Sequence, residues 1–177
     1  MKASDRGEKR SRFQGGRSDG EHPHGDRGQI AFFVIFLIVW ALDSFVFHGT
    51  TMLAAVVPLS VRLTAAGLTF LLTVYLVEKG HRVISDDSFG DKELIKDGVF
   101  ARLRHPLYGG SLLFYLSLFL ATLSLAALAV WCLMAVFYNV IAAYEERLLL
   151  EKFGDEYLEY QHKVPRWFPR IRSAKFA

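Results

Sequence analysis

The chain has 177 residues, of which 52% are hydrophobic and 22% are charged. The apolar and charged residues occupy separate blocks, which excludes a soluble domain of ordinary composition and favours a membrane protein. The net charge of +3 comes from 21 basic and 18 acidic residues, and because the basic residues lie between apolar blocks, no nucleic-acid partner is expected.

Residues 1–29 form a polar N-terminal segment that mixes charged residues with glycine, serine and histidine. So few apolar side chains cannot offset the entropy lost on folding, and we expect a disordered cytoplasmic tail. His22 and His24 lie in this tail, but two histidines in a polar segment do not predict a metal site, and no metal is expected.

The first apolar run covers residues 30–47, and its 18 residues would extend roughly 27 Å as a helix, enough for one membrane span. Asp43 lies near its far end, where we expect it to face other helices or the outer interface, because a charge in lipid is costly. A second apolar run covers residues 61–77, with Arg62 placed to reach the interface. The polar residues 78–104 that follow are predicted to form a structured loop with glycines at its turns.

Residues 107–144 contain no charged residue. As one helix these 38 residues would extend roughly 57 Å, about twice the thickness of the hydrocarbon core, so the run must fold back on itself. Thr122 and Ser124 mark the predicted turn, which gives spans at about 107–121 and 125–144. The charged residues after the fourth span are predicted to form a further helical segment.

These four spans predict an all-α integral membrane protein with a tail at 1–29 and one membrane domain at 30–177. Seven basic residues precede the first span, six lie between the second and third, seven follow the fourth, and only Arg62 lies on the other side. The positive-inside rule therefore places both termini and the middle loop in the cytoplasm. We expect a multi-pass protein of the cell membrane whose C-terminal helical segment is cytoplasmic.

The start of the third span carries the segment Arg104-His105-Pro106-Leu107-Tyr108-Gly109. A residue before proline favours extended backbone, and proline favours the first helical position, so His105 is predicted to be the N-cap. The amide groups and dipole of this helix start suit an anion. The fourth span ends at Glu145 and Glu146 on the same membrane face, where two carboxylates and a helix C-terminus suit a cation. The hairpin therefore predicts a site for a zwitterionic ligand at the cytoplasmic interface.

Several segments of the C-terminal half resemble the signature of the isoprenylcysteine carboxyl methyltransferase family, which belongs with the membrane phospholipid methyltransferases. Their order and spacing agree from about Lys92 to Pro169. The matching segments are Leu94-Ile95-Lys96-Asp97-Gly98-Val99-Phe100, Arg104-His105-Pro106-Leu107-Tyr108-Gly109, Glu145-Glu146, Phe153-Gly154-Asp155-Glu156-Tyr157-Leu158-Glu159-Tyr160 and Val164-Pro165-Arg166.

The resemblance implies an integral membrane methyltransferase that binds S-adenosylmethionine in a cytosol-facing pocket under the C-terminal helical segment. In such a pocket Glu145 would hold the methionine ammonium, Glu146 would complete the paired-glutamate signature, and apolar residues would cover the adenine. No catalytic residue is assigned. The cofactor-binding residues carried over position by position would be Lys92, Glu93, Leu94, Ile95, Phe100, His105, Pro106, Leu107, Tyr108, Glu145 and Glu146.

One position departs from the family pattern in a way that bears on the acceptor. The members that methylate prenylcysteine have an arginine one turn before the first glutamate, which receives the substrate carboxylate, whereas this chain has Ile141. Phe100 stands where those members have tyrosine. Arg102, Arg104 and Arg166 are the candidates for anchoring the acceptor, which we expect to be a lipophilic or lipid-anchored molecule with a carboxylate or another nucleophile.

Methyl transfer from a sulfonium to a carboxylate removes one positive and one negative charge, so a dry pocket favours it. A carboxylate acceptor needs no general acid or base, whereas a thiol or amine acceptor would have to lose a proton. Two alternatives remain open from the sequence. One is a membrane reductase that uses NADPH, since such proteins share a similar C-terminal helical layout, and the other is a non-enzymatic four-helix membrane protein. The oligomeric state is also open.

Overall fold

The computed structural model describes residues 25–85 and 94–169 of the chain, and within these residues every regular element is a helix. This confirms the predicted all-α class. The helices are α1 (Gly25–Ala41), its π-helical continuation η1 (Leu42–Phe47), the 3-10 helix η2 (Met52–Ala55), α2 (Leu59–Ser85), the 3-10 helix η4 (Gly98–Ala101), α3 (Pro106–Thr122), α4 (Leu125–Phe153) and α5 (Asp155–Lys163).

The start of α1 differs from the predicted end of the N-terminal tail. The helix begins at Gly25, so the last residues of the tail predicted at 1–29 are helical. The first backbone N–H groups of a helix have no partner within it. Because the helix begins before the apolar run, the N–H groups of the apolar run itself are hydrogen-bonded within the helix. Residues 1–24, which include His22 and His24, lie outside the described residues.

Two further helices continue past the predicted ends of their membrane spans, α2 into residues predicted as loop and α4 into residues predicted as a further helical segment. Helix α2 ends at Ser85 instead of residue 77, and α4 ends at Phe153 instead of residue 144. The 27 residues of α2 extend roughly 40 Å, whereas the hydrocarbon core is about 30 Å thick. A charged segment beyond the apolar run therefore stays helical, and the ion pair between Glu78 and Arg82 on successive turns of α2 supports it.

Three helical segments are long and apolar enough to cross a membrane, namely Arg27–Phe47, Leu59–Ser85 and Leu125–Phe153. Helix α3 is also apolar, and its 17 residues extend roughly 26 Å. Large apolar side chains are exposed along α1 and α2, among them Ile38 and Leu68, as expected for helices whose outer faces contact lipid. These features agree with the predicted arrangement of about four spans.

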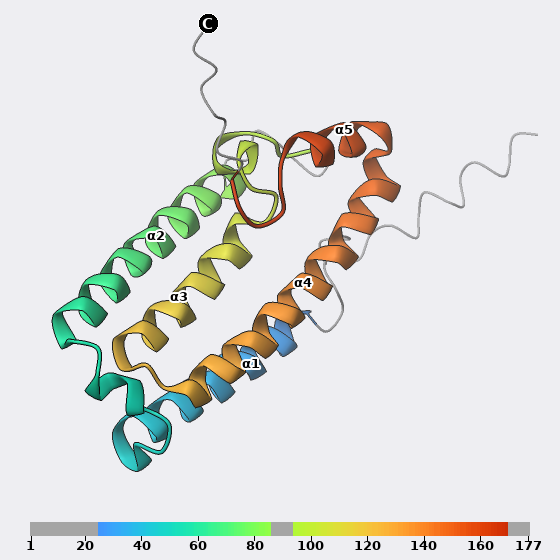
Figure 1. Ribbon diagram of the computed structural model, residues 1–177. Helices are drawn as coiled ribbons and strands as arrows, with labels where there is room; N and C mark the ends of the chain where they lie inside the picture. The colour runs from blue at the N-terminus through green and yellow to red at the C-terminus, as the bar shows by residue number, and fades with distance from the viewer. Residues whose placement is uncertain (1–24, 86–93, 170–177) are drawn as a thin grey trace, which may run out of the picture.

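The helices associate in two pairs, α2 with α3 and α1 with α4. Figure 1 shows α2 and α3 side by side, with α1 lying behind α4. Gly80 and Gly110 allow the close approach of α2 and α3, because an added Cβ would lie 2.7 Å from Leu107 Cδ2 and 2.8 Å from Val77 Cγ2, respectively. A buried cluster joins α1, α3 and α4 through Phe36, Tyr115, Ala127, Met134 and Tyr138.

A buried carboxylate holds the end of the bundle where α3 turns into α4. Asp43 accepts hydrogen bonds from the backbone N and the hydroxyl of Thr50, at 3.0 and 2.6 Å, and from the hydroxyl of Ser124. The Ser124 hydroxyl also caps α4, and Leu123 before it has a left-handed backbone with φ of 54°. The turn therefore lies where the sequence predicted it, and Asp43 faces protein groups as expected.

Arg62, for which we expect a position near the interface, binds the end of α3. Its Nη1 atom donates a hydrogen bond to the carbonyl of Ala121 at 3.2 Å. The last carbonyls of a helix have no partner within it and carry partial negative charge, so a guanidinium is favourable there. The contact ties α2 to α3 at the end of the bundle opposite His105.

Gly154 ends α4 and lets the chain fold back. Its φ of +57° lies in a region that favours glycine, and α5 follows at once. Figure 1 shows α5 and the segment after it returning over the start of α3. We call this end of the bundle, with the start of α3 and the end of α4, the motif end.

Candidate functional site

The start of α3 has the local structure that its sequence predicts. His105 is the N-cap with φ of −124°, and Pro106 occupies the first helical turn. The His105 imidazole makes no capping hydrogen bond and points toward α4, where Nε2 lies 3.1 Å from Glu146 Oε1 and Nδ1 lies 3.6 Å from Glu145 Oε2. The motif end therefore brings His105 and the paired glutamates together, as expected from the antiparallel hairpin.

Glu146 is the most heavily paired carboxylate in the described part of the chain. Its side chain is 5% exposed, and Arg166 contacts it with two nitrogens, Nε–Oε1 at 2.8 Å and Nη2–Oε2 at 2.5 Å. Arg104 Nη1 lies 3.3 Å from Oε1, and Gln161 donates to Oε2 at 3.3 Å. With His105 added, Glu146 contacts four side chains and links α4 to α5, to the segment before α3 and to the segment after α5.

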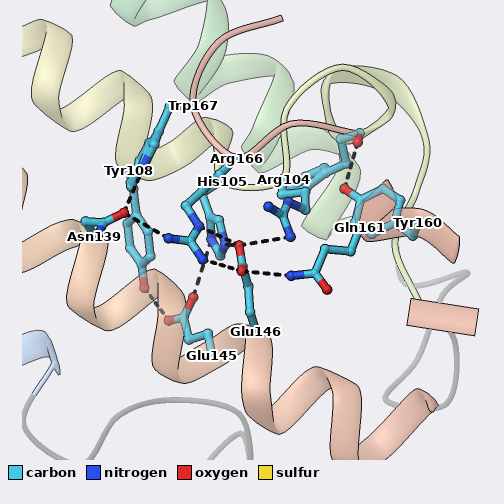
Figure 2. Close-up of polar contacts among 11 residues, drawn as sticks. Arg104, His105, Tyr108, Asn139, Glu145, Glu146, Tyr160, Gln161, Arg166 and Trp167 are labelled. Carbon is cyan, nitrogen blue, oxygen red and sulfur yellow. Dashed lines mark hydrogen bonds and ion pairs between the residues drawn. The ribbon is translucent and has the colours of Figure 1, made fainter. Parts of the chain in front are cut away.

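Glu145 faces a different group of side chains. Because successive helical residues are rotated by about 100°, its carboxylate is directed away from that of Glu146. It accepts a hydrogen bond from the hydroxyl of Tyr108, and its side chain is 18% exposed. The Tyr108 ring stacks on His105, with centroids 5.6 Å apart and an angle of 6° between the planes. Figure 2 shows this carboxylate between Tyr108 and His105.

The segment after α5, residues 164–169, closes over these side chains, and we call it the C-terminal strap. Its backbone is held by a hydrogen bond from Arg104 N to Pro165 O at 3.0 Å. Arg166 Nη1 and Trp167 Nε1 both donate to Asn139 Oδ1, at 2.9 and 3.2 Å. The Trp167 ring lies 6.1 Å from that of His105, so the strap covers the site from the side opposite α4 (Figure 2).

Other residues of the predicted cofactor set lie beneath α5. Leu94 is buried in a cluster with Tyr157, Tyr160 and Val164. The carbonyl of Phe100 accepts a hydrogen bond from the Tyr160 hydroxyl at 2.7 Å. This second group adjoins α5 and the strap, whereas the polar group of His105, Tyr108 and the two glutamates lies on α3 and α4.

The remaining predicted residues take several positions. Ile95 is half-buried, and Pro106 is fully buried at the start of α3. Leu107 is half-buried and packs against Gly80 of α2, so it faces away from the glutamates. Lys92 and Glu93 lie outside the described residues.

Buried polar atoms without hydrogen-bond partners mark the interior of the site. Within the described residues these include Arg104 Nε, Arg104 Nη1 and the Tyr157 hydroxyl. Burial raises the pKa of Tyr157 to about 12 and also raises that of Tyr160, so both phenols stay neutral. The hydrogen bonds that Arg166 donates to the Glu146 carboxylate raise the pKa of Arg166. A fixed positive charge and unused donors therefore lie next to two carboxylates.

The sequence did not single out Asn139, Gln161 and Trp167 as site residues, although all three contact its polar groups. The Val164-Pro165-Arg166 signature pointed to the strap, but nothing in it specified the partners of Arg166. Ile141, which replaces the family arginine, is 3% exposed. The three additional residues come from α4, α5 and the strap, whose approach depends on the turn at Gly154.

An apolar cavity of about 950 Å³ adjoins the site between α2, α3, α4 and the strap. Leu112 and Leu116 of α3, Trp131 of α4 and Trp167 of the strap contribute to its walls. Trp167 also contacts His105 and Asn139, so it borders both the cavity and the polar group.

Comparisons with known proteins give a consistent family relationship. A family model described as phospholipid methyltransferase matches residues 55–156. The protein-S-isoprenylcysteine O-methyltransferase of Schizosaccharomyces pombe is 31% identical over 111 residues, which cover 58% of this chain and 45% of that protein. The human protein of the same name is 32% identical over 102 residues, covering 54% of this chain and 34% of that protein.

A third relative has a different name. The cobalt-zinc-cadmium resistance protein CzcN of Cupriavidus metallidurans is 39% identical over 79 residues, covering 44% of this chain and 36% of that protein. Within residues 25–85 and 94–169, the structure shows no group of three or more histidine, cysteine, aspartate or glutamate side chains arranged to hold a metal.

A solved structure shares the fold. The eukaryotic intramembrane Ras methyltransferase ICMT superposes with a TM-score of 0.62 at 19% identity, over 85% of this chain and 55% of that chain. This likeness shows a common integral membrane fold. The chain spans less than half the length of the curated relatives that it matches, between 34% and 45% for the three described above.

Proposed function

Since this chain belongs to the phospholipid methyltransferase family, we propose that it is a membrane methyltransferase that uses S-adenosylmethionine and methylates a lipophilic acceptor. The observation that carries the proposal is the grouping of Tyr108, His105 and Glu145 beside the cations Arg104 and Arg166. These residues lie at the cofactor positions implied by the family signature or directly contact them. The cofactor and its residues are therefore part of the proposal.

The donor set at the motif end fits a zwitterionic amino acid moiety. Glu145 is the carboxylate proposed to hold the ammonium group, because it is directed at Tyr108 and remains 18% exposed. Arg104 Nε is a buried donor without a hydrogen-bond partner among the described residues, which suits a carboxylate. Glu146 has the different role of binding both arginines and His105, so that their charges do not remain uncompensated in the interior.

S-adenosylmethionine, when bound, supplies a methyl group on a positively charged sulfur. The protein's contribution is to position the donor and acceptor and to exclude water. Tyr108 and His105 present a stacked aromatic surface, and the strap covers them with Trp167. The described geometry does not require a side chain to act as a base when the acceptor is a carboxylate.

We propose that the motif end faces the cytoplasm and that the protein is in the cell membrane. The support is the distribution of basic residues along the sequence. Of the 21 basic residues, 20 lie in the N-terminal segment, the loop between the second and third spans and the C-terminal segment, and only Arg62 lies in the other connections. The positive-inside rule places the segments rich in basic residues in the cytoplasm. Arg62 binds the opposite end of α3. A cytoplasmic motif end would give the site access to soluble cofactor and, through the cavity, to the bilayer.

The two alternatives receive less support. The family match favours methyl transfer over an NADPH-dependent reductase, and it favours an enzyme over a non-enzymatic bundle. Buried ion pairs can often be replaced by apolar residues without loss of stability. A bundle with no other function would therefore not need the ion pairs around Glu146. Stabilisation of the protein by NADPH, and not by S-adenosylhomocysteine, would reverse this preference.

The test is binding of S-adenosylhomocysteine to the detergent-purified protein, measured by calorimetry. The wild type should bind, Glu145→Ala and His105→Ala should weaken binding at least about tenfold, and Glu151→Ala should bind as wild type. Glu151 is an exposed glutamate of the same helix, so it controls for the loss of one negative charge. Absence of binding by folded wild type would overturn the proposal.

A further inference from the structure

Asn139 of α4 is a shared acceptor for two consecutive residues of the C-terminal strap. Its Oδ1 atom accepts hydrogen bonds from Arg166 Nη1 at 2.9 Å and from Trp167 Nε1 at 3.2 Å (Figure 2). Guanidinium and indole nitrogens are donors only, so the oxygen of the Asn139 amide must face the strap. The role of this amide in the contact is therefore that of an acceptor.

The position of Asn139, the only asparagine of the chain, is unusual for an amide. It lies within the apolar run 125–144, six residues before Glu145, which is roughly 9 Å along the helix axis. Its side chain is exposed, and Val136 one turn earlier is 64% exposed, so this face of α4 is directed outward. A polar side chain on the outer face of a membrane helix is costly unless it is hydrogen-bonded. The two bonds from the strap offset this cost.

The two bonds differ in what their loss would release. Arg166 is also held by Glu146, through Nε at 2.8 Å and Nη2 at 2.5 Å, so it would stay in place without Asn139. The indole of Trp167 has a single N–H, which it donates to Asn139. Loss of the amide would therefore free the Trp167 side chain and leave Arg166 bound.

Trp167 lies next to the side chains proposed to hold the cofactor. Its ring centroid is 6.1 Å from that of His105, and His105 stacks on Tyr108. The Tyr108 hydroxyl in turn donates to Glu145. Because Trp167 is only half-buried, an outward movement of its ring would uncover this stack and need not disturb the ion pairs of Glu146.

We propose that Asn139 is a positioning residue that holds Trp167 over the His105–Tyr108 stack, so that the cofactor enters and leaves only when the Asn139–Trp167 bond opens. The inference rests on the proposed function. The bond joins two protein groups, so it forms whether the site is empty or filled and opposes entry and exit alike. Its loss should raise the association and dissociation rates by a similar factor and leave the Kd nearly unchanged, because the bond does not discriminate between the two states.

The experiment measures exchange of tritiated S-adenosylhomocysteine on the full-length protein in nanodiscs of phosphatidylcholine. The time course of binding gives the association rate, and a chase with excess unlabelled ligand gives the dissociation rate. Asn139→Leu removes the acceptor and keeps the size of the side chain. It should raise both rates about fivefold, as expected for one hydrogen bond, with the Kd within about twofold of wild type. Leucine is favourable in a membrane helix, so this variant should fold.

Three further variants test the role of the acceptor. Asn139→Asp retains an oxygen acceptor and adds attraction to Arg166, so both rates should stay at or below those of wild type. Val140→Leu changes the neighbouring side chain, which is 59% exposed, and should exchange as wild type. Trp167→Phe keeps a ring but removes the N–H, and it should exchange as fast as Asn139→Leu. Combining Trp167→Phe with Asn139→Leu should add little, because both changes remove the same bond.

A second measurement follows Trp167 without any cofactor. Iodide is a charged quencher that stays in water, whereas Trp40 and Trp131 lie within the apolar helices α1 and α4. The iodide quenching of tryptophan fluorescence that is lost in Trp167→Phe therefore reports the exposure of Trp167. This quenching should increase in Asn139→Leu and should not increase in Asn139→Asp.

The two measurements distinguish failure of this inference from failure of the proposed function. Wild-type exchange rates in Asn139→Leu would overturn the positioning role even though the cofactor binds. Faster dissociation with unchanged association would also overturn it, because that result indicates direct contact of Asn139 with the ligand. If wild type binds no S-adenosylhomocysteine, the proposed function fails, and iodide quenching still decides whether Asn139 holds Trp167. Unchanged quenching in Asn139→Leu would overturn the inference in either case.

Discussion

Replacing Glu146 by glutamine should destabilise the motif end, because it leaves the positive charges of Arg104 and Arg166 beside a neutral side chain. The Glu146 side chain is 5% exposed, that of Arg104 is 10% exposed and that of Arg166 is 25% exposed. Removing one partner of a buried ion pair costs about 3–5 kcal/mol. Arg166 can regain some hydration, so we expect the lower end, about 3 kcal/mol.

For a protein of this size each kcal/mol lowers the Tm by roughly 2–4 °C, so Glu146→Gln should lower it by roughly 6–12 °C. The assay is thermal unfolding in detergent, followed by tryptophan fluorescence. Glu145→Gln is the matched control, since it changes the neighbouring glutamate and loses mainly hydrogen bonds worth about 1 kcal/mol. It should keep most of the stability while losing affinity for S-adenosylhomocysteine.

A double variant tests the reasoning further. Glu146→Gln combined with Arg166→Gln should be less unstable than the sum of the two single effects, because the second change removes a charge that the first left unpaired. Additive effects, or a Glu146→Gln protein with wild-type Tm, would refute the assignment of Glu146 as the centre of the ion-pair group.

Three further outcomes follow from the packing. Tyr157→Phe should leave the Tm unchanged or raise it, whereas Tyr160→Phe should cost about 1 kcal/mol, because only the Tyr160 hydroxyl has a hydrogen-bond acceptor; both are measured by thermal unfolding. Burial raises the pKa of Tyr157 to about 12. Its contribution to the free energy of unfolding is therefore complete below a pH of about 10 and is lost as the pH rises toward about 12. Measuring the free energy of unfolding as a function of pH, with tyrosinate absorbance recorded in parallel, should show this loss. Gly110→Val should disrupt the pairing of α2 with α3 and lower the Tm, while Gly67→Val, at a position with no atom within 4 Å of an added Cβ, should not.

The sequence predicted the helical class and the cap at His105 because these depend on local patterns. Apolar runs locate the spans, and the proline after His105 determines the start of α3. The helix ends were less predictable. α2 and α4 continue beyond their apolar runs to Ser85 and Phe153, because hydrophobicity reports where the lipid ends and not where the helix ends.

The sequence predicted that Glu145 and Glu146 lie near His105, but it did not predict that the two glutamates bind different side chains. An antiparallel hairpin brings His105 to Glu145 and Glu146 for any bundle of this topology. The bidentate contact of Arg166 with Glu146 depends on how the strap folds back after α5. The cavity beside the site also depends on the close packing of α2 on α3, which no local pattern encodes.

The pairing of α1 with α4 has a consequence for biogenesis. During synthesis α1 is the first of these helices to leave the ribosome and α4 is the last of the four, so α1 must wait in the bilayer while α2 and α3 associate. Asp43 and Ser124, which join the two, are 81 residues apart, and contacts between such distant residues form slowly. Until α4 is inserted, the Asp43 carboxylate lacks its Ser124 donor and depends on Thr50 nearby. Since α5 and the strap follow α4 in the chain, the motif end is completed only after the end that Asp43 and Ser124 hold.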